Sequence, residues 1–188
     1  MHGAEPPSPW VTRFAHLVAP GATVLDVACG AGRHAAFFAE RGCSVDAVDR
    51  DASLVDALAG LTGVRFLTAD IESGPWPYAS RRFDAVIVTN YLHRPLLPVL
   101  RDAVADDGVL LYETFARGNE AFGRPSNPAF LLRPRELLDA FAEGFFVVAY
   151  EDGEIASPRP ARVQRLCAVR GDSRAISLFG GVDGAMRG

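Results

Sequence analysis

Short apolar runs alternate with segments of helical periodicity along most of the chain. Seven of these runs predict strands, over residues 22–27, 44–49, 64–68, 83–89, 109–113, 145–150 and 163–169. Apolar positions at helical spacing predict helices over residues 32–41, 51–58, 95–105 and 135–142. Residues 83–89 are nearly all apolar, as expected of a strand that is buried on both faces. The alternation predicts a doubly wound α/β domain, in which a mostly parallel sheet lies between two layers of helices.

The two ends of this pattern differ from its centre. The sequence Ser-Pro-Trp at residues 8–10 is typical of a helix start and predicts an N-terminal helix over residues 8–19. Near the other end, no helical pattern separates the last two predicted strands, and residues 152–160 form a turn with glycine and prolines. We therefore expect a hairpin that places one antiparallel strand at the edge of the sheet. The pattern predicts a single domain over residues 1–170 and a flexible tail over residues 171–188.

Residues 114–134 form a long segment between a predicted strand and a predicted helix. Long loops within compact domains often cover binding sites. This segment combines the aromatic side chains of Phe115, Phe122 and Phe130 with several polar ones. We expect it to be a substrate-covering loop.

The basic residues are all arginines, which excludes several kinds of chemistry. The 188 residues include 19 arginines, no lysine and 23 acidic residues, which gives a formal net charge of −4. Without lysine, a Schiff-base lysine and the phosphate-binding loop that ends in Gly-Lys-Ser/Thr are both excluded. The acidic balance does not favour nucleic acid as a partner, and no apolar run is long enough to cross a membrane. An anionic substrate would have to be held by arginine.

The cysteines and the N-terminal residues predict a cytoplasmic location. Cys29, Cys43 and Cys167 are odd in number and lack Cys-x-x-Cys spacing, which favours free thiols in a reducing compartment and no metal site. The first residues also lack the basic and apolar regions of a signal peptide.

The sequence Asp-Val-Ala-Cys-Gly-Ala-Gly at residues 26–32 joins the first predicted strand to the following helix. Glycines permit a sharp turn there, and the helix N-terminus offers unpaired amides to a ligand. Gly30, Gly32 and Ala35 also satisfy the dinucleotide fingerprint, and Asp49 follows at the spacing of a ribose-binding acid. An NAD-linked oxidoreductase is therefore one alternative.

Three acids favour a different nucleoside, because Asp26, Asp49 and Asp70 end three successive predicted strands. A buried carboxylate at position 26 would repel a pyrophosphate but would attract a sulfonium that carries an amino group. Asp49 has two oxygens for the two ribose hydroxyls. Asp70 can accept an adenine amino hydrogen while Ile71 packs on the ring. Together these residues suit a ligand with an amine, a ribose and an adenine but no phosphate.

With these motifs the chain resembles the class I S-adenosylmethionine-dependent methyltransferases over residues 22–170. The resemblance is carried by VLDVACGAGRHA, VDAVDRD, FLTADI, FDAVIVTNYLH and GVLLYET, with Ala28 where the family has its first glycine. It implies a Rossmann-like sheet of seven strands in the order 3-2-1-4-5-7-6, with strand 7 antiparallel. It also implies S-adenosylmethionine as the cofactor. The chain is similar in particular to small bacterial methyltransferases of the tellurite-resistance and ubiquinone-biosynthesis type.

The resemblance also indicates which residues form the site. The expected cofactor-binding residues are Asp26, Ala28, Cys29, Gly30, Gly32, Asp49, Arg50, Asp70, Ile71 and Asn90. His93 and Tyr91, just past the fourth strand, are the candidate catalytic residues, with His93 as proton acceptor. The expected acceptor is a small molecule.

Structural roles remain alternatives to these assignments for several residues. Asp26 is also suited to capping loop amides, Cys29 to packing, Asp70 to starting a turn and His93 to a position in a turn. Tyr112 and Glu113 are weaker candidates for lining a substrate pocket. The arginines expected near an anionic acceptor are Arg33, Arg94, Arg117 and Arg124. A non-catalytic, nucleoside-binding domain of the same fold is a further alternative function.

Overall fold

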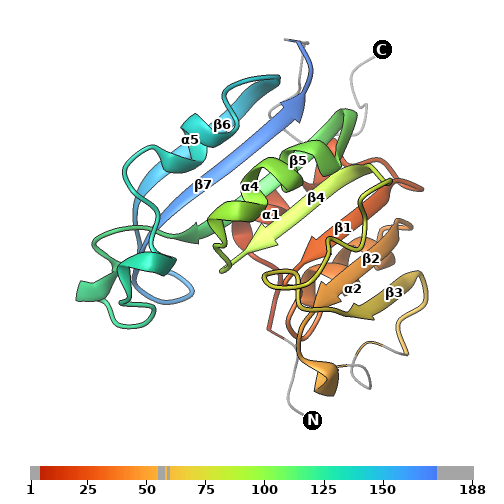
Figure 1. The fold of residues 1–188 in the computed structure, drawn as a ribbon, viewed down its shortest axis with the longest axis horizontal. Coiled ribbons are helices and arrows are strands. Elements are labelled where there is room, and N and C mark those ends of the chain that lie inside the picture. Colours follow the sequence, from red (N-terminus) through yellow and green to blue (C-terminus); the bar gives the residue numbers. More distant parts are fainter. Residues whose placement is uncertain (1–4, 55–57, 59, 173–188) are drawn as a thin grey trace, which may run out of the picture.

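The fold is a single mixed sheet with helices on both faces, in a computed structural model that describes residues 5–54, 58 and 60–172. Its strands are β1 (Thr23–Val27), β2 (Ser44–Asp49), β3 (Val64–Thr68), β4 (Phe83–Thr89), β5 (Val104–Phe115), β6 (Phe145–Ile155) and β7 (Ala161–Arg170). Within the described residues, these seven strands lie in the order β3-β2-β1-β4-β5-β7-β6 (Figure 1). Neighbours from β3 to β5 are parallel, whereas β7 is antiparallel to both β5 and β6. The predicted fold class and strand order are confirmed.

The hairpin of β6 and β7 departs from the simpler expectation in one respect. Its antiparallel strand is β7, which lies inside the sheet, while β6 forms the edge. The chain passes from β5 to β6 at the edge, and the hairpin then folds back so that β7 pairs with β5. As a result, the turn between β6 and β7 lies at the same end of the sheet as the carboxyl end of β5, because Phe115 pairs with Val163.

Helices cover the two faces of the sheet. On one face lie α1 (Pro9–Phe14), η1 (Ala15–Leu17) and α2 (Arg33–Glu40), and on the other η3 (Arg94–Leu96), α4 (Leu97–Ala103) and α5 (Glu136–Ala140) (Figure 1). The helix predicted over residues 51–58 begins as η2 (Ala52–Leu54), and residues 55–57 lie outside the described part of the chain. The tail predicted beyond residue 171 also falls mostly outside it, from residue 173 on. Among the described residues, no helix has the length and apolar character needed to cross a membrane.

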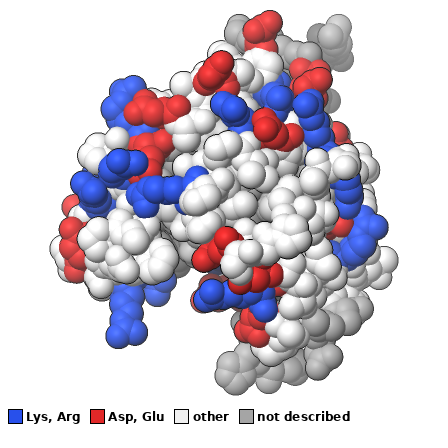
Figure 2. Space-filling view, in the orientation of Figure 1, with Lys and Arg blue, Asp and Glu red and all other residues white. Residues whose placement is uncertain are grey.

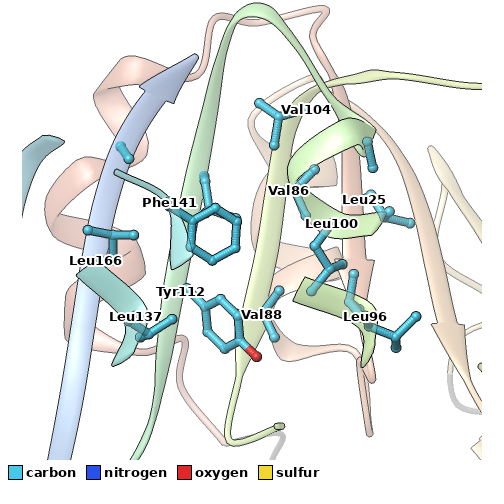
Figure 3. Packing of buried hydrophobic residues seen from close by; sticks show 14 of the residues in the cluster. Leu25, Val86, Val88, Leu96, Leu100, Val104, Tyr112, Leu137, Phe141 and Leu166 are labelled. Carbon is cyan, nitrogen blue, oxygen red and sulfur yellow. The ribbon is translucent and has the colours of Figure 1, made fainter. Parts of the chain in front are cut away.

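Two apolar clusters hold these helices on the sheet. In one cluster, Tyr112 and Phe141 pack between α5 and the sheet, and Leu100 of α4 lies near Val86 and Val88 (Figure 3). The other cluster contains Trp10 of α1, whose indole Nε1 also donates a hydrogen bond of 3.2 Å to the carbonyl of Leu166. The predicted N-terminal helix is thereby held against the middle of β7.

Candidate functional site

A cavity of about 390 Å³ opens at the carboxyl ends of β1 to β5. Strand order reverses there between β1 and β4, and open α/β sheets bind ligands at such a switch point. The cavity is lined by Ala28, Asp49, Arg50, Ala69, Asp70, Ile71, Glu72, Asn90, Tyr91, Leu92, Thr114, Phe115, Pro125 and Phe130. Six of the predicted cofactor-binding residues and one predicted catalytic residue are thus brought together. We call this space the first cavity.

The loop between β1 and α2 places Ala28 in the first cavity by adopting left-handed backbone conformations. Ala28, Gly30 and Gly32 have φ angles of 51°, 53° and 74°. Such conformations cost a residue other than glycine about 1 kcal/mol or more and are concentrated at functional sites. Gly30 and Gly32 do not line the cavity themselves. A Cβ at Gly32 would lie 2.0 Å from Cδ2 of Leu58, so this glycine is required for packing as well as for backbone conformation.

Asp49 lies at the end of β2 with both carboxylate oxygens held by backbone amides. Oδ2 accepts a hydrogen bond of 2.9 Å from the amide of Gly30, and Oδ1 accepts one of 3.0 Å from the amide of Asp51. A carboxylate oxygen accepts more than one hydrogen bond, so each oxygen keeps capacity for a further donor. The carboxylate is therefore fixed in place and still able to receive two hydroxyls from the cavity.

Asp70 both lines the first cavity and starts a turn, whereas its expected contact with an adenine stays a prediction. Its Oδ1 accepts hydrogen bonds from the amides of Glu72 and Ser73, and its Oδ2 accepts one of 2.6 Å from the hydroxyl of Ser73. The Ser73 hydroxyl, followed by these amides, holds the pKa of Asp70 below its usual value. The carboxylate is thus ionised at neutral pH, with buried Ile71 beside it on the wall of the cavity.

Asp26 lies in β1 and Cys29 in the loop that follows it. Neither residue lines this cavity or the second cavity described below. Burial raises the pKa of Asp26 to about 8, against the opposing effects of the Ala35 amide in α2 and of Arg33. Its Oδ2 is buried and has no hydrogen-bond partner among the described residues. Burial also raises the pKa of Cys29, which remains a thiol. These contacts agree with the alternatives in which Asp26 supports the helix N-terminus and Cys29 packs; direct cofactor contact stays a prediction.

Of the two candidate catalytic residues after β4, Tyr91 lines the first cavity and His93 does not. Asn90 has a φ of 56°, and after this turn Asn90, Tyr91 and Leu92 line the first cavity. His93 lies outside the lining, with its Nδ1 3.9 Å from Oε2 of Glu72. Burial, followed by the charge of Glu72, raises the pKa of Tyr91, so its hydroxyl is a donor rather than a base.

The segment 114–134 contributes Phe115, Pro125 and Phe130 to the lining of the first cavity, and its role as a substrate-covering loop stays a prediction. Arg94, which does not line the first cavity, holds this segment in place. This guanidinium donates to both carboxylate oxygens of Glu136 and to the backbone carbonyls of Ala129 and Leu131.

The anchor at Arg94 is an internal ion pair. Burial acts to raise the pKa of Glu136, but hydrogen bonds from Arg94 and Arg133 outweigh it and lower this pKa to about 2. Because its donors are already in use, Arg94 does not meet the expectation that it holds an anionic substrate.

A second cavity of about 490 Å³ adjoins the first, and both are lined by Asn90 and Phe115. Its walls come from the segment before α1, the start of α2, the end of β5 and the turn between β6 and β7. Its other lining residues are Glu5, Pro6, Pro7, Ser8, Pro9, Arg33, Glu113, Ile155, Ser157, Pro158, Arg159, Ala161, Val163 and Arg165. Glu113 therefore does line a pocket, whereas the hydroxyl of Tyr112 is spent on the carbonyl of Tyr91 at 3.0 Å.

A buried polar network fixes the N-terminal wall of the second cavity. The amide of Ser8 donates to Nε2 of His34 at 3.1 Å, and its hydroxyl donates to Glu113 at 2.8 Å. Glu113 also forms an ion pair with Arg165. Burial, with a smaller effect of Arg33, lowers the pKa of His34 to about 3, so the ring stays neutral and accepts the Ser8 hydrogen bond.

The residues that sequence analysis missed belong mostly to this second cavity. Arg159 and Arg165 were not singled out, and neither was the run of prolines before α1. Of the arginines expected near an anionic acceptor, Arg33 lines the second cavity, while Arg117 and Arg124 are exposed and line neither cavity. No local spacing marks these positions, because the cavity joins segments that are more than 100 residues apart.

Residues 24–106 match a family model described as a methyltransferase domain. A search of curated proteins finds no match.

Several solved structures share the fold. TehB from Haemophilus influenzae has a TM-score of 0.70 and 17% identity, over 86% of this chain and 61% of that one, so this chain spans less than two thirds of it. A putative S-adenosylmethionine-dependent methyltransferase from Listeria monocytogenes has a TM-score of 0.66 and 16% identity, over 87% of this chain and 98% of that one.

A third similar structure contains ligands. The 1,6-didemethyltoxoflavin-N1-methyltransferase of Burkholderia thailandensis has a TM-score of 0.62 and 22% identity, over 87% of this chain and 76% of that one. It was solved with 1,6-didemethyltoxoflavin and S-adenosylhomocysteine bound. At these identities the likeness is one of fold.

Proposed function

We propose that this chain transfers a methyl group from S-adenosylmethionine to a small molecule, because residues 24–106 match a methyltransferase domain and the fold is shared with a putative S-adenosylmethionine-dependent methyltransferase. The observation that carries the proposal is the convergence of Asp49, Asp70 and Ile71 on the first cavity. S-adenosylmethionine supplies a methyl group that is already activated by the sulfonium charge. The protein mainly has to bind the cofactor and the acceptor, align them with each other and exclude water.

The charges of the first cavity fit this cofactor better than a dinucleotide. Its lining contains the carboxylates of Asp49, Asp70 and Glu72 and, as a basic residue, Arg50. Such an excess of carboxylates favours a cationic ligand and disfavours a pyrophosphate. Asp49 is placed to hold the ribose hydroxyls, and Asp70 and Ile71 to hold the adenine. Ala28 and Asn90 would then border the sulfur.

Alignment rather than proton transfer is the role we propose for the residues around the acceptor. The phenol of Tyr91 is suited to donate a hydrogen bond, and His93 lies outside both cavities. An acceptor that is already nucleophilic, such as an oxyanion or a thiolate, needs no base.

We further propose a small-molecule acceptor rather than nucleic acid, and a cytoplasmic location. On the face seen in Figure 2, arginines and carboxylates are interspersed. A nucleic-acid site would instead favour a continuous basic stripe. The cytoplasmic location is supported by the three cysteines, which are all free and buried.

Calorimetric titration with S-adenosylmethionine and with NAD tests the proposed function. We expect S-adenosylmethionine and S-adenosylhomocysteine to bind with dissociation constants on the order of micromolar, a range common for enzyme ligands, and NAD to give no heat of binding. NAD binding without S-adenosylmethionine binding would show that the chain is a dinucleotide enzyme and would contradict the proposal.

A further inference from the structure

The second cavity is placed to hold a ligand next to whatever fills the first. The two spaces share Asn90 and Phe115, which follow and end the neighbouring strands β4 and β5. Each has the volume of a site for one small molecule. If the cofactor occupies the first cavity, the second is the adjoining space for an acceptor.

The walls of the second cavity are preformed. Pro6, Pro7 and Pro9 have fixed φ angles, and the hydrogen bonds of Ser8 to His34 and Glu113 hold this segment in place. The wall across the cavity, from the β6–β7 hairpin, includes apolar Ile155 and Val163. The lining therefore suits a compact apolar body.

The charged groups of this cavity leave two arginines available to a ligand. Arg165 is held by Glu113 and by Glu151, with which it forms an ion pair of 3.3 Å. Arg159 has no hydrogen bond or ion pair to any described residue. Among the described residues, Arg33 forms an ion pair of 3.2 Å with Glu5, whose side chain is 84% exposed, and donates a hydrogen bond of 3.4 Å to the carbonyl of Pro6.

The pair of Arg33 and Glu5 is easily replaced. Exposed ion pairs contribute only about 0–1 kcal/mol, so a ligand oxyanion can take the place of Glu5 at little cost. The side chain of Arg33 is only 19% exposed, and hydrogen bonds that it donates to a ligand would be partly shielded from solvent. The second cavity is lined by three arginines and by two carboxylates, Glu5 and Glu113, so its lining has one excess positive charge.

From these observations we infer that the second cavity is the acceptor site and takes a small carboxylate on an apolar body, with Arg33 and Arg159 as its carboxylate-binding residues. The inference rests on the proposed function, because it places the acceptor beside the cofactor. A guanidinium donates two parallel hydrogen bonds to a planar carboxylate, which suits this class of ligand.

The test uses matched pairs of small molecules on the protein saturated with S-adenosylhomocysteine. Benzoate, indole-3-acetate and hexanoate are each compared by calorimetry with their neutral amides, and phenyl phosphate is added as a different oxyanion. We expect at least one carboxylate to bind about tenfold or more tightly than its amide, because only the carboxylate forms charge-assisted hydrogen bonds. No preference in any pair, or a preference for phenyl phosphate alone, would overturn the inference.

Two variants locate the effect. Arg33→Ala and Arg159→Ala should each weaken carboxylate binding about tenfold and reduce the preference over the amide. Both should keep their affinity for S-adenosylhomocysteine. The control is Arg82→Ala, which removes an exposed arginine just before β4, at the opposite end of the strands, where it pairs with exposed Asp106.

The outcomes separate this inference from the proposed function. Loss of S-adenosylhomocysteine binding in Arg33→Ala would assign this arginine to the cofactor and overturn the inference alone. Failure of the wild-type protein to bind S-adenosylmethionine or S-adenosylhomocysteine would instead contradict the proposed function.

Discussion

Replacing Asp49 with alanine is expected to weaken the binding of S-adenosylmethionine about 100-fold or more. Its carboxylate is held by the amides of Gly30 and Asp51 and retains one accepting position on each oxygen. Two hydrogen bonds from ribose hydroxyls to a charged group are each worth about 1.5–3 kcal/mol, and 1.4 kcal/mol corresponds to tenfold in affinity. Calorimetric titration of wild-type and variant protein measures the difference directly.

The control for Asp49→Ala is Asp102→Ala, which removes an exposed aspartate that lines neither cavity. We expect this control to bind S-adenosylmethionine as the wild type does. Thermal unfolding of both unliganded variants shows whether the loop has kept its structure, since Asp49 also accepts the amide of Gly30. A folded Asp49→Ala protein with wild-type affinity would exclude this residue from the cofactor site.

Replacing Gly32 with alanine is expected to lower the free energy of unfolding by about 2–3 kcal/mol. Left-handed conformations cost a residue other than glycine about 1 kcal/mol or more, and overpacking a core costs about 1–3 kcal/mol. Both penalties apply here, because φ is 74° and the new Cβ would lie 2.0 Å from the side chain of Leu58. Leu58 is fully buried, which restricts its freedom to move aside. Urea unfolding measures the loss.

Gly30→Ala is the matched control for the packing contribution. Gly30 also has a positive φ, of 53°, but a Cβ at this position meets no atom within 4 Å. We expect this variant to lose only about 1 kcal/mol, the cost of the backbone conformation. Equal losses in the two variants would show that the contact with Leu58 does not contribute.

The strands were predictable from sequence because each is a local pattern of apolar residues. The buried runs of β1, β2 and β4 are marked by their own composition, and the acids that end β1, β2 and β3 are found by counting from them. The position of β7 inside the sheet was not predictable from such patterns. It depends on pairing between β5 and β7, which lie far apart in the chain, and only the family resemblance indicated it.

Some residues of the candidate site were likewise predictable from local sequence patterns, and others were not. Asp49 and Asp70 were predictable because they follow strands that end at the switch point of the sheet, where open α/β sheets bind ligands. His93 was not, because the left-handed turn at Asn90 changes which of the following side chains face the cavity. No local sequence pattern predicted the second cavity, because its arginines come from α2, from the β6–β7 turn and from β7.

A crystal structure of the protein with S-adenosylhomocysteine tests the central claim most directly. We expect the ribose hydroxyls within hydrogen-bond distance of Asp49, the adenine beside Asp70 and Ile71, and the sulfur near Asn90, facing the second cavity. A nucleoside bound outside the first cavity, or a sulfur that faces away from Asn90 and Phe115, would contradict it.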